Sequence, residues 1–321
     1  MSRSKGFSLV ELAVALAIIA LLLAGALIPL STQIDVRNGA DTQRSMESIR
    51  EAITGFSQAN GRLPCPADGS IAAGAPNAGT EQFNGSSCIA AFGVIPWVTL
   101  GVAETDAWGR RFSYQVSPAF ADSVYLPSPP NPPGTPQPTW NTLAPGTPYA
   151  PPPAPPTYLS QTIPSPSTSP HNQTPPCDLT SAPTLSSFAL CTLGDIAVFT
   201  RTPSATPSPA VPLGSALPAV FISHGKNGLG AWQSNGIRLP APAAGTDEAA
   251  NVNGNTKATP TGGYQSWAFY SRSPAPASAG CADPAPPPAT SAAPACEFDD
   301  IVMMISSSAL ITRMVAAGRL P

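Results

Sequence analysis

The chain has 321 residues, a formal net charge of -3 at pH 7, and only 10% charged residues. This balance offers no basic surface for nucleic acid, so we expect no nucleic-acid partner. The chain also contains 42 prolines, many of them clustered, which exclude regular helices and central strands from much of its length. The hydrophobic core is therefore smaller than the length of the chain suggests.

The first 30 residues combine a basic start with a long apolar run. Arg3 and Lys5 precede the run, and no charged residue occurs from Leu12 to Leu30. A helix of about 19 residues covers roughly 30 Å, enough to cross the hydrocarbon core of a bilayer, and the basic leader keeps the N-terminus in the cytoplasm. A secretory signal fits less well, because its apolar region is shorter and ends at a small-residue cleavage site. A plain membrane anchor leaves the acidic Glu11 unexplained.

The motif GFSLVEL, with its basic leader and apolar helix, resembles the signal of the type IV pilin-like superfamily, and it is most similar to that of type II secretion pseudopilins. The resemblance implies that a prepilin peptidase removes the leader, residues 1–6, by cutting after Gly6, and then methylates the new N-terminal residue, Phe7. It also implies that Glu11 meets the terminal amine of a neighbouring subunit in the filament, where each charge compensates the desolvation of the other.

The same resemblance implies a location and a set of partners. The protein is expected in the bacterial inner membrane, with a single span over residues 7–30 and a periplasmic head, and its filament in the periplasm or at the cell surface. The implied partners are the prepilin peptidase, other pilin or pseudopilin subunits, and an inner-membrane assembly platform.

The helical pattern continues beyond the apolar run and predicts one helix over residues 7–59. In its second half, apolar side chains recur along one face and oppositely charged pairs along the other. The apolar face consists of Ile34, Met46, Ile49, Ile53 and Phe56. Asn60 and Gly61 end the helix, with the glycine supplying a left-handed cap. Residues 60–321 then form the head.

Six cysteines lie beyond the apolar run, on the exported side where disulfides persist. No two are spaced as C-x-x-C, which argues against a zinc ribbon or a thioredoxin-like redox pair. An even number of cysteines favours disulfides, although six allow many pairings. Because the cysteines form three couples that are close in sequence, our first hypothesis is Cys65–Cys88, Cys177–Cys191 and Cys281–Cys296. Buried unpaired thiols are the alternative.

The segment DAWGRRFSY resembles a segment of the major pseudopilins of type II secretion, through Asp106, Trp108, Gly109, Phe112 and Tyr114. Its alternating apolar positions predict a strand. We interpret Trp108 as filling the gap between helix and sheet, and Gly109 as the turn before the strand. A sugar-binding tryptophan is the alternative.

Three Pro-rich segments interrupt the head, near residues 127–183, 203–212 and 274–294. Their composition favours polyproline II or disorder, so we interpret them as surface insertions in one head. Between them, GDIAVFT and PAVFISHG predict short strands, and His224 lies in the turn after the second. No G-x-S-x-G or H-E-x-x-H motif occurs, so the sequence indicates no catalytic residue and no enzyme.

Near the C-terminus, FDDIV resembles the last part of the major pseudopilins, where a loop beside the last strand binds calcium. The resemblance implies that Asp299 and Asp300 supply oxygen ligands to a structural calcium ion; no other cofactor is expected. A calcium site needs about six to eight ligands, and the sequence does not identify the others. The alternative is an acidic pair that faces solvent at the start of the strand IVMMI.

Together these patterns predict an α+β, pilin-like fold in which a long N-terminal helix, membrane-spanning in its first half, packs on a small antiparallel sheet with Pro-rich loop insertions. The favoured function is a non-enzymatic filament subunit, similar to a pseudopilin of a type II protein secretion system. One alternative is a minor pilin of a type IV pilus, serving adhesion, motility or DNA uptake. Another is an adhesive or carbohydrate-binding module that this helix tethers to the membrane.

Overall fold

The computed structural model describes residues 9–85, 87–121, 186–188, 192, 194–201, 210–253, 257–258, 266–283 and 295–320. At residues 21–32, 253, 257–258 and 266 it describes the backbone alone. The helices are α1 (Leu9–Asn60), α2 (Trp97–Leu100), α3 (Pro118–Ala121), α4 (Asp247–Asn253) and α5 (Ser307–Ala316). The strands are β1 (Phe92–Val94), β2 (Ser113–Val116), β3 (Ile196–Thr200), β4 (Val211–Leu217), β5 (Ala219–Ser223), β6 (Lys257–Ala258), β7 (Ser266–Tyr270) and β8 (Ile301–Ile305).

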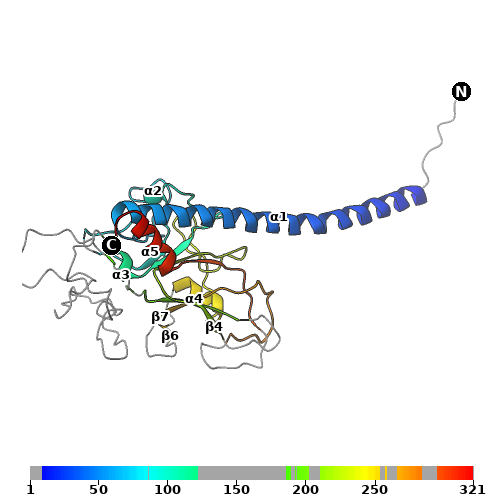
Figure 1. The fold of residues 1–321 in the computed structure, drawn as a ribbon. Helices are drawn as coiled ribbons and strands as arrows, with labels where there is room; N and C mark the ends of the chain where they lie inside the picture. The colour runs from blue at the N-terminus through cyan, green and yellow to red at the C-terminus, as the bar shows by residue number, and fades with distance from the viewer. Residues whose placement is uncertain are drawn as a thin grey trace, which may run out of the picture.

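Helix α1 is a single helix of 52 residues, and Figure 1 shows its N-terminal part projecting far beyond the head. It ends at Asn60, one residue later than the sequence predicted, while the predicted start at Phe7 lies outside the described residues. Gly61 ends the helix with a φ of 71°, and its N–H donates to the carbonyl oxygen of Ser57 at 2.7 Å. A side chain with a β-carbon is strained in this left-handed conformation, which explains the glycine.

The part of α1 on the head buries one stripe of side chains. Met46, Ile49 and Ile53 are fully buried in the main core, as the apolar pattern predicted. The prediction was wrong for Ile34, which is 50% exposed. Its neighbour Asp35 accepts a hydrogen bond from the Nζ of Lys226 at 2.7 Å, so Ile34 lies where α1 leaves the head.

The head contains two four-stranded sheets, whereas the sequence predicted one small antiparallel sheet. The first sheet has the order β1-β2-β5-β8 and is antiparallel throughout. The second has the order β4-β3-β7-β6, and its central pair, β3 and β7, is parallel. The strands predicted from DAWGRRFSY, GDIAVFT, PAVFISHG and IVMMI are β2, β3, β5 and β8.

Alternating side chains divide the interior into three clusters. Phe221 of β5 packs in the main core between the first sheet and α1, whereas its neighbour Val220 packs between the two sheets. Strand β3 alternates in the same way, because Val198 joins the cluster between the sheets and Phe199 joins a cluster on the opposite face, with Ala250 of α4. The layers therefore run from α1 through the first sheet to the second, which lies furthest from α1 in Figure 1.

Helix α5 and the residues after it fasten the end of α1 to the head. Arg319 donates from Nε to the carbonyl oxygen of Gln58 at 2.8 Å, and from Nη2 to that of Ala59. These carbonyls belong to the last turn of α1, which has no basic residue of its own. Arg319 thus supplies the positive charge that stabilises a helix C-terminus.

The Pro-rich segments lie largely outside the described residues, including all of the predicted insertion 127–183. Strand β4 begins at Val211 and contains Pro212, so the last residues of the 203–212 segment are strand rather than loop. Strand β4 is at the edge of its sheet, where a proline costs no ladder hydrogen bond. In the segment 274–294, Ala275 forms a bridge with Phe298, and residues 284–294 are not described.

Candidate functional site

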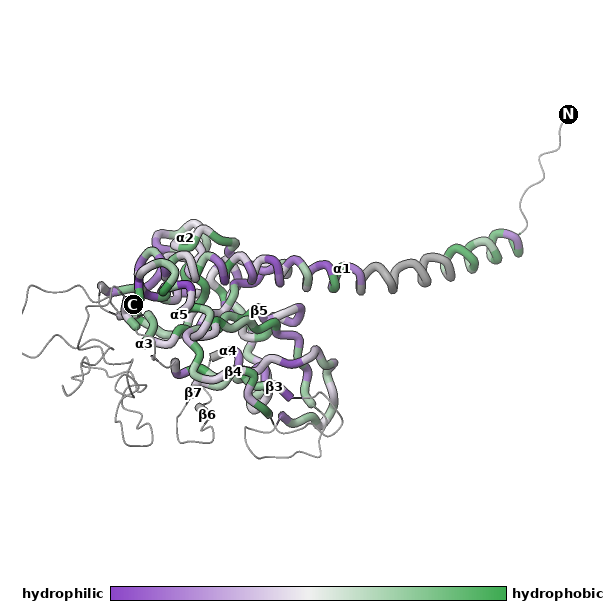
Figure 2. The backbone as a smooth tube through the Cα atoms, in the orientation of Figure 1, coloured by the Kyte–Doolittle hydropathy of each residue, from purple (hydrophilic) through white to green (hydrophobic). Residues whose placement is uncertain are grey.

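The part of α1 that projects from the head exposes apolar side chains. All described side chains from Leu9 to Ala20 are exposed, and Figure 2 shows this end of the helix as largely hydrophobic. The large ones are Leu9, Val10, Leu12, Val14, Leu16, Ile18 and Ile19. A continuous apolar surface of this kind marks a site of contact with a membrane or with other protein subunits.

Glu11 lies in the first turn of α1, within this apolar surface, and is exposed. Gly6 and Phe7, the predicted cleavage and methylation positions, lie outside the described residues. Within the described part of the chain, no helix is long and apolar enough to span a membrane. The span predicted over residues 7–30 includes positions 7, 8 and 21–30, whose side chains the structure does not describe.

Asp106 organises the turn that leads into β2. Its Oδ1 accepts the backbone N–H groups of Trp108 and Arg110, each at 2.9 Å, and its Oδ2 accepts the hydroxyl of Ser223 at 2.6 Å. Burial raises the pKa of Asp106, because desolvation of its carboxylate outweighs these hydrogen bonds. Gly109 has a φ of 78° and makes the predicted turn.

The tryptophan of the main core is Trp97, which precedes this turn in the sequence. Trp108, which the sequence predicted in the gap between helix and sheet, is only half-buried. Gly79 explains the position of Trp97, because a β-carbon at Gly79 would lie 2.2 Å from the indole ring. The guanidinium of Arg111 covers the same ring at 4.4 Å from its centroid.

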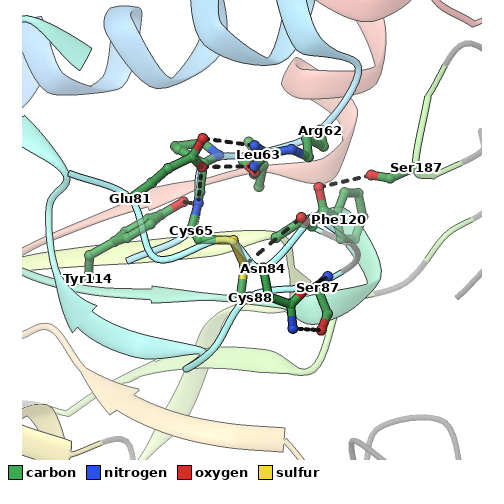
Figure 3. Close-up of a disulfide and its surroundings, with 12 residues drawn as sticks. Arg62, Leu63, Cys65, Glu81, Asn84, Ser87, Cys88, Tyr114, Phe120 and Ser187 are labelled. Carbon is green, nitrogen blue, oxygen red and sulfur yellow. Dashed lines mark hydrogen bonds and ion pairs between the residues drawn. A yellow bond between two sulfur atoms is a disulfide. The ribbon is translucent and has the colours of Figure 1, made fainter. Parts of the chain in front are cut away.

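The predicted disulfide Cys65–Cys88 is present, and Figure 3 shows it beside a buried ion pair. Arg62 donates to both carboxylate oxygens of Glu81 at 2.9 and 2.8 Å, and Glu81 also accepts the backbone N–H of Cys65 at 3.0 Å. The hydroxyl of Tyr114 donates to the backbone carbonyl just before Cys65 at 3.1 Å. The bidentate pair holds the segment after α1 to the loop that carries Glu81, and the Tyr114 hydrogen bond holds it to β2.

The predicted disulfide Cys281–Cys296 is also present. Cys177 and Cys191 lie outside the described residues, so the third pairing stays a prediction. The two observed disulfides join cysteines separated by 23 and 15 residues. Closing such loops stabilises a folded domain mainly by constraining the unfolded chain.

Three carboxylates converge where α4 meets the start of β8. Asp299 and Asp300, the residues predicted to bind calcium, directly precede β8, and Glu248 reaches them from the first turn of α4. One oxygen of each carboxylate lies within 4.8 Å of the others. Asp300 and Glu248 are buried and Asp299 is half-buried, so the alternative of a solvent-facing acidic pair was wrong.

The cluster offers oxygen atoms of the kind that bind a hard divalent cation. Oδ1 of Asp299 is buried and accepts no hydrogen bond from an N–H group or a hydroxyl of the described residues, while its Oδ2 accepts the backbone N–H of Asn227 at 2.7 Å. The carboxyl group of Glu248 lies within hydrogen-bond reach of Asp299 when it is protonated. The side-chain amide of Asn227 donates to both oxygens of Glu248, at 3.2 and 3.3 Å. Carboxylate oxygens are the ligand type that calcium prefers, so these three residues could hold such an ion.

Burial and the neighbouring negative charges raise the pKa of two of these carboxyl groups. Burial, together with the negative charge of Asp300, raises the pKa of Glu248 to about 8. Burial likewise raises the pKa of Asp299. A cation among the three carboxylates would reverse these effects by favouring their ionised forms.

His224 begins the predicted turn and lies beside the cluster. Its Nε2 shares a hydrogen bond of 2.7 Å with the Oγ of Ser113, and its Nδ1 lies 3.5 Å from Oδ1 of Asp300. The order of these groups is that of a Ser-His-Asp triad, but all three residues are buried, and Ser113 lies in β2 with strands on both sides. Because a nucleophile must reach its substrate, we interpret this row as a structural network of the head.

Sequence reasoning missed Glu248 as a member of this cluster. Glu248 precedes Asp299 by 51 residues, and no motif spacing relates the two. The only local signal is the acidic pair Asp247-Glu248 at the start of α4. Acidic residues are common in the first turn of helices because they stabilise the helix dipole, so the pair alone does not indicate a cation site.

Comparison with known proteins identifies the N-terminal segment. Residues 1–27 match the family model of the prokaryotic N-terminal methylation motif. The chain carries a type IV pilin-like prepilin signal. Such a signal implies processing by a peptidase and assembly with other pilin-type subunits, which are structural proteins rather than enzymes. No curated protein and no solved structure matches the chain significantly.

Proposed function

We propose that this protein is a filament subunit of a type II protein secretion system. The observation that carries the proposal is the prepilin signal at residues 1–27, placed at the start of a 52-residue helix whose outer part exposes apolar side chains. One end of the helix is packed on a head and the other is free. Copies of such a helix can bury their apolar surfaces against one another while the heads remain outside.

The choice of type II secretion rests on the two segments that resemble major pseudopilins. Asp106 and Gly109 form the turn that starts β2, and Asp299 and Asp300 lie in an acidic cluster beside β8. Both segments are ordered parts of the head, and their likeness to pseudopilin segments supports the proposal. A minor pilin of a type IV pilus shares the same prepilin signal, and loss of pilus function rather than of protein secretion in a deletion strain would favour it.

In the proposed mechanism, residues 7–30 hold the protein in the inner membrane before assembly. When subunits join, the carboxylate of Glu11 compensates the methylated amine of Phe7 in a neighbouring copy. Both charges lie among apolar helices, where an unpaired charge costs several kcal/mol, roughly 3–5. The pair therefore sets the register in which α1 helices pack.

Intact-mass analysis of protein extracted from the membrane tests the processing step. We expect the mass of residues 7–321 with one added methyl group. Replacing Gly6 with a bulky residue, as in Gly6→Val, should leave the full-length precursor. A mature N-terminus beyond Ala24, which signal peptidase would leave, would contradict the proposal.

We also propose that Glu248, Asp299 and Asp300 hold a structural calcium ion in the head. The ion would supply the positive charge that the three buried or half-buried carboxylates lack, and would tie α4 to β8. Calcium should raise the Tm of the full-length protein in detergent, and a chelator should reverse the effect. Glu248→Gln should abolish the calcium response; an unchanged response in this variant would show that the ion binds elsewhere.

A further inference from the structure

We propose that Asp247 and the Cys281–Cys296 disulfide position the ligands of the cation site, and that the disulfide and the cation stabilise one another. The inference rests on the calcium site proposed above and adds the part of the chain that controls its affinity. Its structural basis is the first turn of α4, which connects the three carboxylates to a buried group of charges.

Two consecutive acidic residues of α4 contact two different groups. Glu248 accepts the backbone N–H of Asp299 at 2.9 Å, on the side of the cation site. Asp247 is buried, and its two oxygens contact Nη2 of Arg201 at 3.0 Å and Nε of Arg272 at 2.8 Å. Because Asp247 is held from two directions, the turn that carries Glu248 has a fixed orientation.

The same group of buried charges also contacts the backbone of the disulfide. Asp283, two residues after Cys281, accepts the backbone N–H of Asp247 at 3.0 Å and that of Cys296 at 3.1 Å. Arg272 donates to the carbonyl oxygen of Cys296 at 2.8 Å. A continuous series of hydrogen bonds and ion pairs therefore runs from the disulfide to the first turn of α4.

The disulfide also constrains the other two ligands. Cys296 closely precedes Asp299, and Phe298 between them is fully buried and forms a bridge with Ala275. Asn251, also on α4, donates to Oδ2 of Asp300 at 2.8 Å. The three carboxylates are thus brought together by one framework that the disulfide closes.

A framework of this kind links cation binding and disulfide formation thermodynamically. Three carboxylates repel one another, so a looser framework lets them separate and lowers the affinity for a cation. Linkage is reciprocal, and a cation that binds better to the closed framework must favour the disulfide by the same factor. Couplings between sites in proteins commonly amount to about 5–150-fold in affinity.

Calcium titration of the full-length protein in detergent tests the inference. The variants are Asp247→Asn and the double variant Cys281→Ser, Cys296→Ser, with Cys65→Ser, Cys88→Ser as the matched control. We expect calcium affinity to fall about tenfold in the first two and to stay unchanged in the control. The control removes the other observed disulfide, which lies beside Arg62 and Glu81 in the segment after α1.

The outcomes separate the two proposals. A purely structural role would lower the Tm in EDTA without changing the Kd of the folded protein, and that result would overturn the positioning role. Equal calcium affinity in all variants would overturn it too, while leaving the calcium site in place. Absence of calcium binding to the wild type would overturn the site and the inference together.

A second measurement uses the wild-type protein, so it tests the inference even if a variant fails to fold. Dithiothreitol supplies two electrons and two protons, so the S–S bond becomes two thiols while the reductant becomes a cyclic disulfide. In a buffer of reduced and oxidised dithiothreitol, calcium should shift the half-reduction ratio of Cys281–Cys296 by about tenfold. Alkylation and peptide mapping should show no shift for Cys65–Cys88. Identical ratios with calcium and with EDTA would overturn the inference.

Discussion

Two isoleucines on α1 provide a direct test of where the helix meets the head. Ile53 is fully buried in the main core, whereas Ile34 is 50% exposed where α1 leaves the head. Both belong to the apolar face that the sequence predicted. Ile53→Ala should therefore destabilise the head strongly, and Ile34→Ala should serve as a control with the same chemical change on the same helix.

The magnitudes follow from burial. Replacing isoleucine by alanine removes three carbon atoms, each worth about 0.8 kcal/mol when it is withdrawn from water. At Ile53 this gives about 2.4 kcal/mol, and the cavity left between α1 and the first sheet raises the expected loss to about 3 kcal/mol. At Ile34 half of the side chain is already in solvent and no closed cavity forms, so the loss should be about 1 kcal/mol or less.

Urea unfolding of the full-length protein in detergent measures both losses. The chain has five tryptophans, among them Trp97 in the main core, so their fluorescence should report the unfolding of the head. The midpoint should fall clearly for Ile53→Ala and little for Ile34→Ala, with an unchanged slope for both. Equal losses would refute the reasoning, because they would mean that α1 contacts the head equally at both positions.

Two further predictions concern Arg319 and Glu248. Arg319→Ala should cost about 1 kcal/mol of unfolding free energy, because it removes a cation from the last turn of α1. Arg313→Ala breaks an exposed pair with Glu51 and should cost about half of that or less, so equal Tm losses for the two variants would contradict the prediction. For Glu248, the pKa rises from its ordinary 4.5 to about 8 on folding, so its stabilising contribution is complete below about 4.5 and is lost as the pH rises through about 8. In EDTA the Tm should fall over this range, and Glu248→Gln should remove part of the fall; a variant with the same pH profile as the wild type would contradict it.

Features with a local cause could be predicted from the sequence. Helix α1 and its end at Gly61 follow from apolar periodicity and from the freedom of glycine at positive φ. Strand β2 follows from the alternation of Phe112, Tyr114 and Val116, all of which are buried in the main core. The two observed disulfides join cysteines that are near one another in sequence, so proximity along the chain identified them.

Features that depend on distant segments could not be predicted. The second sheet pairs β3 with β7 in parallel, although 65 residues separate the end of β3 from the start of β7 and no local pattern in the sequence relates the two strands. Ile34 continues the apolar period of α1, yet its burial depends on where the head ends. Glu248 joins Asp299 only because α4 packs beside β8, and a first-turn glutamate is equally suited to a helix with no site.

Cross-linking of α1 between copies in cells tests the central claim most directly. Val36 is 70% exposed and lies where α1 leaves the head, so Val36→Cys places a reactive thiol there. With a short bis-maleimide, neighbouring copies in a filament should give a cross-linked dimer, because each copy offers one reactive thiol. Adding Glu11→Ala should remove the dimer while leaving the processed protein in the membrane. Monomers alone in cells with an active secretion system, or an unchanged dimer yield in the Glu11→Ala variant, would contradict assembly through α1 and its charge pair.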